Sequence, residues 1–201
     1  MSPISEAIED LQAGKMVILV DAEDRENEGD LLISAEKATP EAINFMLTYA
    51  RGFLCMPVSD ARAESLGLHP MVQNNTCHFG TPFTVTIDAR EGITTGVSVD
   101  DRWTTIQKVL ASDATPDDFV RPGHMFPLRA APGGVLERAG HTEGAVELMR
   151  LAGLQPVSLI AEVMNPDGSM SKMPQLQEFS IRHSLKICTI QAIRELLEKT
   201  K

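Results

Sequence analysis

The stretch Asp21-Ala-Glu-Asp-Arg-Glu-Asn-Glu-Gly-Asp30 contains six acidic residues in ten positions. It lies between two apolar runs, Met16–Val20 and Leu31–Ile33, which indicates a connection between two buried strands rather than an acidic tail. Two carboxylates about 4 Å apart repel each other by roughly 1 kcal/mol in water and roughly 4 kcal/mol at an effective dielectric constant near 20. A cluster of this kind beside a core requires a cation, a proton or an arginine, and Arg25 supplies part of that positive charge.

The spacing of the acidic residues predicts that they share a face. If the second strand begins in the middle of the stretch, Glu26, Glu28 and Asp30 recur with a period of two and point the same way. A hard divalent cation suits such a face, although carboxylates solvated in a turn are the simpler interpretation. A calcium-binding EF-hand is excluded, because a loop that starts at Asp24 has Ala35 at its twelfth position, where a bidentate Glu is required.

Length, charge and cysteine content narrow the class of protein. A chain of 201 residues predicts one domain, residues 1–201, with a substantial core. The formal net charge of −10 argues against nucleic-acid or membrane partners. Cys55, Cys77 and Cys188 lack CxxC spacing and indicate neither a disulfide framework nor a structural zinc site. We find no signal peptide and no membrane-spanning run, so we expect a cytoplasmic protein.

Apolar periodicity and turn signals predict helices and strands that mix without strict alternation. Helices are expected over 5–13, 39–50, 60–67, 101–111, 143–152, 174–184 and 189–199. Strands are expected over 16–21, 30–34, 53–58, 83–89, 125–130, 157–164 and 186–188. The predicted fold class is α+β (mixed α/β), a single-domain layered sandwich with a mixed, twisted β-sheet covered by helices. Residues 68–80 lack periodicity and are predicted to form a loop that carries function or contacts.

A second candidate site is Arg138-Ala-Gly-His-Thr142, which directly precedes a helix that Thr142 is expected to cap. The free amides and partial positive charge of a helix N-terminus suit a phosphate group. Arg138 adds a forked donor and Thr142 a hydroxyl, while His141 stands where it could instead ligate a metal. An ordinary capped helix with a surface histidine fits the sequence equally well.

Three further residues are candidates for chemistry. His124 follows Pro-Gly and is either a hydrogen-bonded loop histidine or a general acid/base, since an unperturbed histidine titrates near pH 6.5. Glu162 is the one ionisable residue of the apolar run 157–164, so it is either paired or has a pKa raised for proton transfer. Cys55 is first interpreted as a small buried hydrophobe.

Together these segments resemble the 3,4-dihydroxy-2-butanone 4-phosphate synthase family of riboflavin biosynthesis. The resemblance covers nearly the whole chain in the family's order, through 21–30, Gly80-Thr-Pro-Phe-Thr-Val-Thr-Ile-Asp88, Gly92-Ile-Thr-Thr-Gly-Val-Ser98, Arg121-Pro-Gly-His-Met-Phe-Pro-Leu128, Arg138-Ala-Gly-His-Thr-Glu143 and Ala161-Glu162. Each segment alone is weak evidence for the family, whereas the whole set in this order is highly specific for it. Ala22 stands where the family often has Asp, and Ala139 where many members have Gly, and neither change touches a motif's functional side chains.

The resemblance implies a reaction and its requirements. Ribulose 5-phosphate is converted to 3,4-dihydroxy-2-butanone 4-phosphate, and its C4 carbon is lost as formate. The lyase requires a divalent cation, Mg²⁺ or Mn²⁺, with two ions expected per site. A homodimer with its sites near the subunit interface is also implied.

The resemblance also implies residue roles. Glu26 and His141 would ligate metal, and His124 and Glu162 would be the catalytic residues that transfer protons. Glu28 and Cys55 would line the site. The substrate-binding residues would be Arg25, Glu26, Asp30, Arg138, Ala139, Gly140, His141, Thr142 and Glu162, with Arg25, Asp30 and the 138–142 segment holding the sugar phosphate.

Two other functions stay open at this stage. One is a metal-dependent phosphatase or aldolase-like enzyme, which would release inorganic phosphate or an aldehyde instead of formate. The other is a non-catalytic sugar-phosphate or metal sensor. Family members are often fused to a GTP cyclohydrolase II domain. We expect a monofunctional chain here, because the sequence ends at Lys201 and has no zinc-type cysteine cluster.

Overall fold

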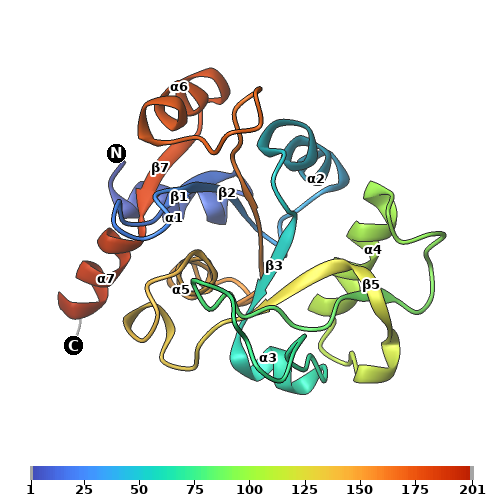
Figure 1. Cartoon of the computed structure of the whole chain (residues 1–201). Helices are drawn as coiled ribbons and strands as arrows, with labels where there is room; N and C mark the ends of the chain where they lie inside the picture. Colours follow the sequence, from blue (N-terminus) through green and yellow to red (C-terminus); the bar gives the residue numbers. More distant parts are fainter. Residues whose placement is uncertain (1, 200–201) are drawn as a thin grey trace.

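The computed structural model describes residues 2–199, in which seven strands form one sheet in the order β4-β5-β3-β6-β2-β1-β7 (Figure 1). The strands are β1 Val17–Val20, β2 Gly29–Ser34, β3 Cys55–Val58, β4 Ile87–Ala89, β5 Phe119–Arg129, β6 Ser158–Glu162 and β7 Lys186–Thr189. The β1–β7 and β3–β5 pairs are parallel, and the other neighbouring pairs are antiparallel. The predicted fold class, a mixed sheet covered by helices, is confirmed.

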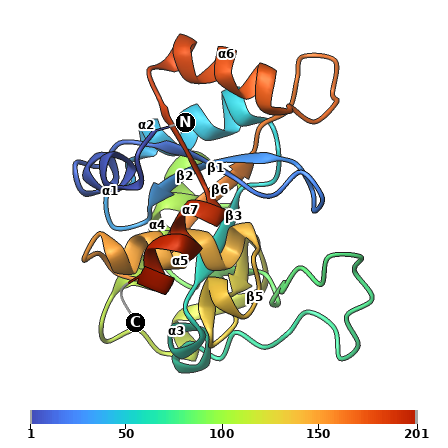
Figure 2. The same ribbon diagram turned by 90° about the vertical axis from the view of Figure 1, so that its left-hand side faces the viewer.

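Helices cover both faces of this sheet. They are α1 Ile4–Gln12, α2 Pro40–Phe45, α3 Asp60–Ser65, α4 Val99–Leu110, α5 His141–Leu151, α6 Met173–His183 and α7 Ile190–Lys199, with the short helices η1 Met46–Ala50, η2 Pro116–Asp118 and η3 Gly134–Leu136. Figure 2 shows α2 and α6 on one side of β1 and β2, and α5 and α7 on the other. No helix among residues 2–199 is long and apolar enough to cross a membrane.

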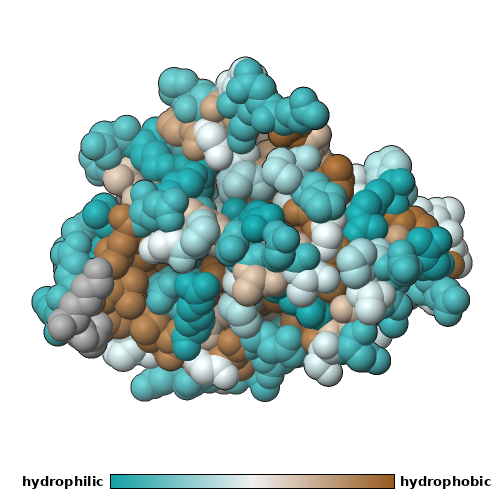
Figure 3. Space-filling view, turned by 90° about the horizontal axis from the view of Figure 1, so that it is seen from below, coloured by the Kyte–Doolittle hydropathy of each residue, from teal (hydrophilic) through white to brown (hydrophobic). Residues whose placement is uncertain are grey.

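Alternate residues of the strands build two separate cores, because successive side chains of a strand point to opposite faces. Ile18 and Val20 pack into the core beneath α2, α4 and α6, whereas Val17 and Leu19 pack into the core beneath α1, α5 and α7. Seen from below, apolar residues also gather on the surface beside the end of α7 (Figure 3). The predicted domain, 1–201, includes residues 1, 200 and 201, which lie outside the described part of the chain.

Several predicted boundaries are corrected. The helix expected over 39–50 is α-helical only to Phe45 and continues as the π-helix η1. The strand expected from 125 begins at Phe119, so the Pro-Gly pair before His124 lies inside β5 rather than in a turn. Ser59, not Asp60, caps α3. The expected capping role of Thr189 is borne out by its Oγ1, which accepts a hydrogen bond of 3.1 Å from the N–H of Ala192.

Three structural features bring the candidate residues together. The antiparallel β1–β2 pair carries the acidic stretch at its turn, and β6 pairs with β2 so that Glu162 lies directly opposite Asp30. Helix α5 begins beside them at His141. The segment between α3 and β4 projects from the body as an extended loop (green in Figure 2) and returns along the same region through Phe79.

Candidate active site

The turn between β1 and β2 is folded around the carboxylate of Asp21. Its Oδ2 accepts hydrogen bonds from the N–H of Glu26 at 3.0 Å and from Arg25 Nη1 at 3.0 Å, and its Oδ1 accepts from the N–H of Glu28 at 2.9 Å. The side chain of Asp21 is completely buried. Asn27 takes the left-handed conformation, φ 54°, that this tight path requires. Asp21 therefore determines the shape of the turn.

This turn decides where the second strand begins. The strand expected over 30–34 is confirmed as β2, Gly29–Ser34, whereas the conditional alternative of a start near Arg25 is wrong, because residues 23–26 form a turn. The amides of Glu26 and Glu28 bond to Asp21 instead of to a neighbouring strand. Glu26, Glu28 and Asp30 nevertheless converge on one cavity, so the shared face exists for a different reason.

The cavity has a volume of about 240 Å³. It lies among the acidic turn, the start of α5, the end of β6 and the returning loop. Its lining residues are Glu26, Glu28, Asp30, Phe79, Thr81, Phe83, Leu128, Arg138, His141, Thr142, Ile160 and Glu162. Six of the predicted site residues thus meet here: Glu26, Asp30, Arg138, His141, Thr142 and Glu162. Arg25 does not line the cavity, but it bonds Glu26 at 3.1 Å and lies over the ring of Phe79, 5.4 Å from the ring centroid.

His141 is the centre of a buried charged cluster. Its Nδ1 lies 3.3 Å from Glu26 Oε2, and its Nε2 lies 3.9 Å from Asp30 Oδ1. His141 is 6% exposed and Asp30 is 3% exposed. Among the described residues, neither His141 Nε2 nor Asp30 Oδ1 has a hydrogen-bond partner. Buried polar atoms are rarely left unpaired, so these two atoms indicate a place for a ligand.

The pKa values of this cluster reflect the crowding of negative charge. Burial raises the pKa of Asp30 to about 7, against the opposing charge of His141 and with further increases from neighbouring carboxylates such as Glu162. Burial alone would lower the pKa of His141, but Asp30, Glu26 and Asp21 outweigh it and raise that pKa to about 9. Without a metal, a proton on His141 supplies the positive charge that the carboxylates need.

The start of α5 differs from its prediction at one residue. Gly140, not Thr142, is the N-cap, so His141 and Thr142 are the first two helical residues and their side chains face the cavity. Arg138 is held beside them, because its Nη1 donates to Glu143 Oε2 at 2.6 Å and its Nη2 donates to the Phe79 carbonyl at 3.0 Å. Ala139 and Gly140 do not line the cavity, and Ala139 packs against the core beneath α1, α5 and α7.

Glu162 is the last residue of β6 and is half-buried. Its Oε2 accepts a hydrogen bond of 2.8 Å from the N–H of Phe53. A Cβ at Gly52 would collide with the Glu162 carboxylate and backbone, so only glycine allows this close approach. The carboxylate is therefore positioned from behind by backbone, while its face toward the cavity is available.

His124 is not among the residues that line this cavity. It lies on β5, four residues before Leu128, which corresponds to roughly 13 Å along a strand. Its Nδ1 lies 2.7 Å from Asp88 Oδ2, and its N–H donates to Asp88 Oδ1 at 2.8 Å. Asp88 is 4% exposed, whereas the side chain of His124 is 47% exposed. Asp88 therefore orients the His124 ring, and this partner was not identified from the sequence.

The remaining candidates separate into two groups. Glu28 lines the cavity, and burial raises its pKa. Cys55 does not line the cavity; it is 3% exposed, and burial raises the pKa of its thiol, as expected for a small buried hydrophobe. Phe79, Thr81 and Phe83 were missed as lining residues. The sequence signals for them were the non-periodic loop 68–80, which contains Phe79, and the resemblance segment 80–88, which contains Thr81 and Phe83.

The chain is similar to known proteins over nearly its whole length. Residues 5–196 match the family model for 3,4-dihydroxy-2-butanone 4-phosphate synthase. The chain is 58% identical to riboflavin biosynthesis protein RibBA of Aquifex aeolicus, over 93% of this chain and 47% of that protein. It is 50% identical to a 3,4-dihydroxy-2-butanone 4-phosphate synthase of Shewanella pealeana, over 94% of this chain and 90% of that protein.

A solved structure is similar throughout. A crystal structure of 3,4-dihydroxy-2-butanone 4-phosphate synthase in complex with two magnesium ions superposes with a TM-score of 0.94 at 40% identity, and the match covers 100% of this chain and 98% of that one. The chain nevertheless spans only about half the length of several curated relatives that it matches, the Aquifex protein among them.

Proposed function

The chain belongs to the 3,4-dihydroxy-2-butanone 4-phosphate synthase family, and we propose that it catalyses the reaction for which that family is named. Ribulose 5-phosphate is the substrate, and 3,4-dihydroxy-2-butanone 4-phosphate and formate are the products. The observation that carries the proposal is the cluster of part-exposed Glu26 with buried His141 and Asp30, which faces a cavity that also holds Glu162 and the start of α5. We further propose that the protein acts in the cytoplasm.

The side chains of the cluster fit a hard divalent cation. Asp21, Glu26 and His141 have potential ligand atoms within 4.8 Å of one another, and Asp30 Oδ1 and His141 Nε2 are buried without partners. Asp21 already accepts three hydrogen bonds, so Glu26 and His141 would hold the metal. A bound Mg²⁺ or Mn²⁺ acts as a Lewis acid toward negative charge that develops on sugar oxygens. A relative binds two magnesium ions, and two per site are proposed here.

The phosphate of the substrate is proposed to bind at the start of α5. The first amides of a helix have no partner within the helix, and the helix dipole favours an anion there. Thr142 adds its hydroxyl, and Arg138 adds guanidinium N–H groups beyond the two that it donates to Glu143 and to the Phe79 carbonyl. Arg25 is held by its contacts with Glu26 and the Phe79 ring, and it would add positive charge near the phosphate. Asp30 would repel a phosphate, so it suits a sugar hydroxyl better.

The reaction requires several proton transfers, since it passes through enediol-type intermediates, a dehydration, a skeletal migration and a hydrolytic fragmentation. Glu162 is placed to exchange protons with a sugar in the cavity, because the Phe53 N–H fixes one carboxylate oxygen and leaves the carboxylate face free. In the metal-free protein, burial raises the pKa of Asp30 to about 7, so this carboxyl can hold a proton there near neutral pH. Together these carboxyl groups provide acid and base on one side of the sugar.

His124 is proposed to act across a dimer interface. It lies outside the cavity of its own chain, yet Asp88 orients its ring and its side chain is half exposed. A hollow that shares Phe83 and Glu162 with the cavity carries exposed apolar side chains, Phe53 at 62% and Met71 at 42%, which a second copy would cover. In a symmetric homodimer each copy would supply His124 to the other's cavity.

Mixing two inactive variants tests this arrangement. Glu26→Gln disables the cavity of its own chain, whereas His124→Ala disables the site that receives the histidine. If His124 acts across the interface, random mixing restores about a quarter of wild-type activity, because half the dimers then contain one intact site. If the histidine acts within its own chain, the mixture stays inactive.

The proposed reaction is tested by measuring formate and inorganic phosphate released from ribulose 5-phosphate, with magnesium and with EDTA. We expect metal-dependent formate and no phosphate. Release of phosphate would indicate a phosphatase instead. Binding of the sugar phosphate without any product would indicate a sensor.

A further inference from the structure

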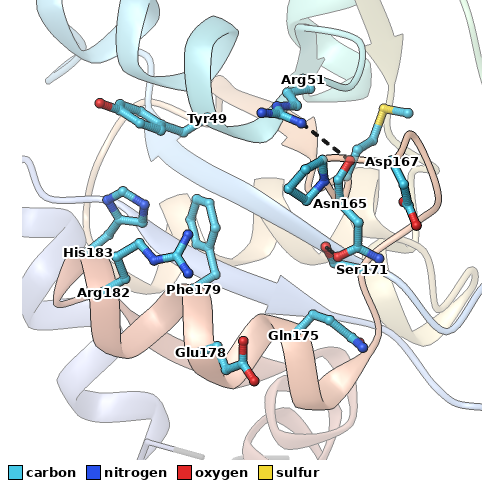
Figure 4. A pocket seen from close by; sticks show the side chains of 12 residues that line it. Tyr49, Arg51, Asn165, Asp167, Ser171, Gln175, Glu178, Phe179, Arg182 and His183 are labelled. Atoms are coloured by element: carbon cyan, nitrogen blue, oxygen red, sulfur yellow. Dashed lines mark hydrogen bonds between the residues drawn. The ribbon is translucent and has the colours of Figure 1, made fainter.

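A second cavity, of about 510 Å³, lies on the side of the molecule that carries α2 and α6. Its walls come from the end of the π-helix η1, the turn 164–171 and the face of α6 (Figure 4). It shares no lining residue with the cavity around Glu26 and His141. Its volume is within the range of small-molecule sites, and no role proposed above uses it.

Aromatic rings form one wall of this second cavity. The ring centroid of His183 lies 4.4 Å from that of Phe179 and 4.9 Å from that of Tyr49. Burial and the neighbouring Arg182 lower the pKa of His183, which keeps its ring neutral at pH 7. Tyr49 remains 46% exposed in spite of these contacts. A neutral aromatic surface of this kind suits a planar ring.

Two arginines reach the same cavity without a carboxylate partner. Among residues 2–199, neither Arg51 nor Arg182 forms an ion pair, and the Arg51 guanidinium makes only a long hydrogen bond of 3.4 Å to the Asn165 carbonyl. Asp167 is turned to its own loop, where it accepts hydrogen bonds from Ser169 at 2.6 and 2.9 Å. Figure 4 shows Glu178 pointing away from Arg51. Two unpaired guanidinium groups in a chain of net charge −10 are suited to an anionic group.

The backbone under this cavity is held in uncommon conformations. Arg51 has φ 73°, in the left-handed region that disfavours residues with a Cβ, and it directly follows the π-helix Met46–Ala50. Both features occur preferentially at functional sites. The conformation directs the Arg51 side chain over the cavity, opposite α6 (Figure 4).

We propose that this second cavity binds a small planar heteroaromatic molecule that carries a phosphate, of the nucleoside monophosphate class. The ring stacks on Tyr49 and the neighbouring aromatic wall. The phosphate lies between Arg51 and Arg182, which provide forked donors. The amide of Gln175 and the hydroxyl of Ser171 are on the same lining and supply polar contacts to the ring edge or the sugar.

Calorimetric titration of the full chain in EDTA tests the ligand class with AMP and flavin mononucleotide as probes. The controls are adenosine, riboflavin and inorganic phosphate. We expect at least one of the two probes to bind with a Kd below about 1 mM, and its dephosphorylated form and free phosphate to bind at least about tenfold more weakly. Failure of both probes to bind would overturn the proposal, and so would equal affinity for inorganic phosphate, because the aromatic wall would then contribute nothing.

Variants locate the binding. Arg182→Gln and Tyr49→Ala change exposed side chains of the second cavity and should each weaken the probe at least about tenfold, or about 1.4 kcal/mol. Arg102→Gln removes the same charge from α4, outside the cavity, and should leave the Kd unchanged. Arg138→Gln should also leave it unchanged. Loss of binding in Arg138→Gln but not in Arg182→Gln would show that the probe uses the first cavity, and the proposal would be wrong.

Discussion

Asp21 and Asp30 stand at the two ends of one acidic stretch, and both are buried, but their surroundings differ completely. Asp21 accepts two backbone N–H groups and one arginine N–H, so its carboxylate is nearly saturated. Asp30 has one oxygen without a partner and lies beside His141 Nε2, which is also unpaired. Two buried acids thus differ in hydrogen-bond satisfaction, and this difference is the basis for proposing a structural role for Asp21 and a functional role for Asp30.

The largest effect of a substitution on turnover is expected at Glu26, which contacts His141 in the cluster around Asp30. Glu26→Gln should lower turnover by about 10³-fold or more, equivalent to about 4 kcal/mol, mainly because it weakens metal binding. The free energy of unfolding should change by less than about 1 kcal/mol, since Glu26 is part-exposed and carries none of the turn's backbone bonds with its side chain. Steady-state assays over a magnesium titration measure both kcat and the metal requirement.

Asp24→Asn is the matched control for Glu26→Gln, because Asp24 is an exposed carboxylate in the same turn. It should leave turnover and metal dependence unchanged. Full activity of Glu26→Gln at low magnesium would refute the assignment of Glu26 as a metal ligand.

At the other end of the acidic stretch, where Asp21 shapes the turn, Asp21→Ala should reduce the free energy of unfolding by about 3 kcal/mol. The substitution leaves two part-buried backbone N–H groups without their acceptor, and each such loss costs about 1–3 kcal/mol when the group is shielded from water. Urea denaturation in EDTA measures the change without a contribution from metal binding. If Asp21→Ala were as stable as the wild type, the turn would not depend on this carboxylate and the contrast with Asp30 would fail.

The pH dependence of the free energy of unfolding should reveal the protons bound by His141 and Asp30, whose buried side-chain atoms lack hydrogen-bond partners. In the metal-free protein, the pKa of His141 is raised from 6.5 to about 9, so its stabilising contribution is complete below about pH 6.5 and is lost as the pH rises through 9. The pKa of Asp30 is raised to about 7, so its contribution is lost earlier, as the pH rises from about 4 through 7. In both windows the native state binds more protons than the unfolded state.

Urea denaturation in EDTA at pH 6, 7.5 and 9 is therefore expected to show stability falling with pH, by an amount on the order of 1–2 kcal/mol. Saturating magnesium should weaken or reverse this trend, because the metal replaces the proton on His141. A stability that is constant or rising with pH in EDTA would contradict the protonation of this cluster.

The smallest effect on stability is expected at Asn27, which lies between Asp21 and Asp30 in the acidic stretch. Asn27→Gly should leave stability nearly unchanged, whereas Asn27→Ala should cost about 1 kcal/mol, because φ 54° is open to glycine and asparagine but strained for alanine. Thermal denaturation of the two variants isolates this backbone effect, since both remove the same side-chain amide. Equal melting temperatures would show that the turn relaxes around the substitution.

Much of the fold was predictable because local patterns agree with it. The apolar runs of β1 and β2, and the start of α2 at Thr39-Pro40, follow from periodicity and capping. The start of β5 was not predictable from its Pro-Gly pair. Gly123 lies so close to the backbone of Ile87 that any Cβ would collide with it. Because this contact joins two strands that are distant in the sequence, the local sequence does not reveal it.

The site was predictable in its residues more than in its geometry. Four of the predicted residues do line one cavity: Glu26, Asp30, His141 and Glu162. The turn that brings the acids together forms because the Asp21 carboxylate accepts hydrogen bonds from two backbone N–H groups. No period-two pattern in the sequence indicates these bonds. The Asp88 partner of His124 is 36 residues away in the chain, so only the β4–β5 pairing reveals it.

The most direct test of this account is carbon-13 NMR of ribulose 5-phosphate labelled at C4, incubated with the wild-type chain and with Glu26→Gln. The account predicts that the label appears in formate, only when magnesium is present and only with the wild type. Label retained in a five-carbon sugar after loss of phosphate, or formate produced equally by Glu26→Gln in EDTA, would contradict a metal-dependent lyase centred on Glu26 and His141.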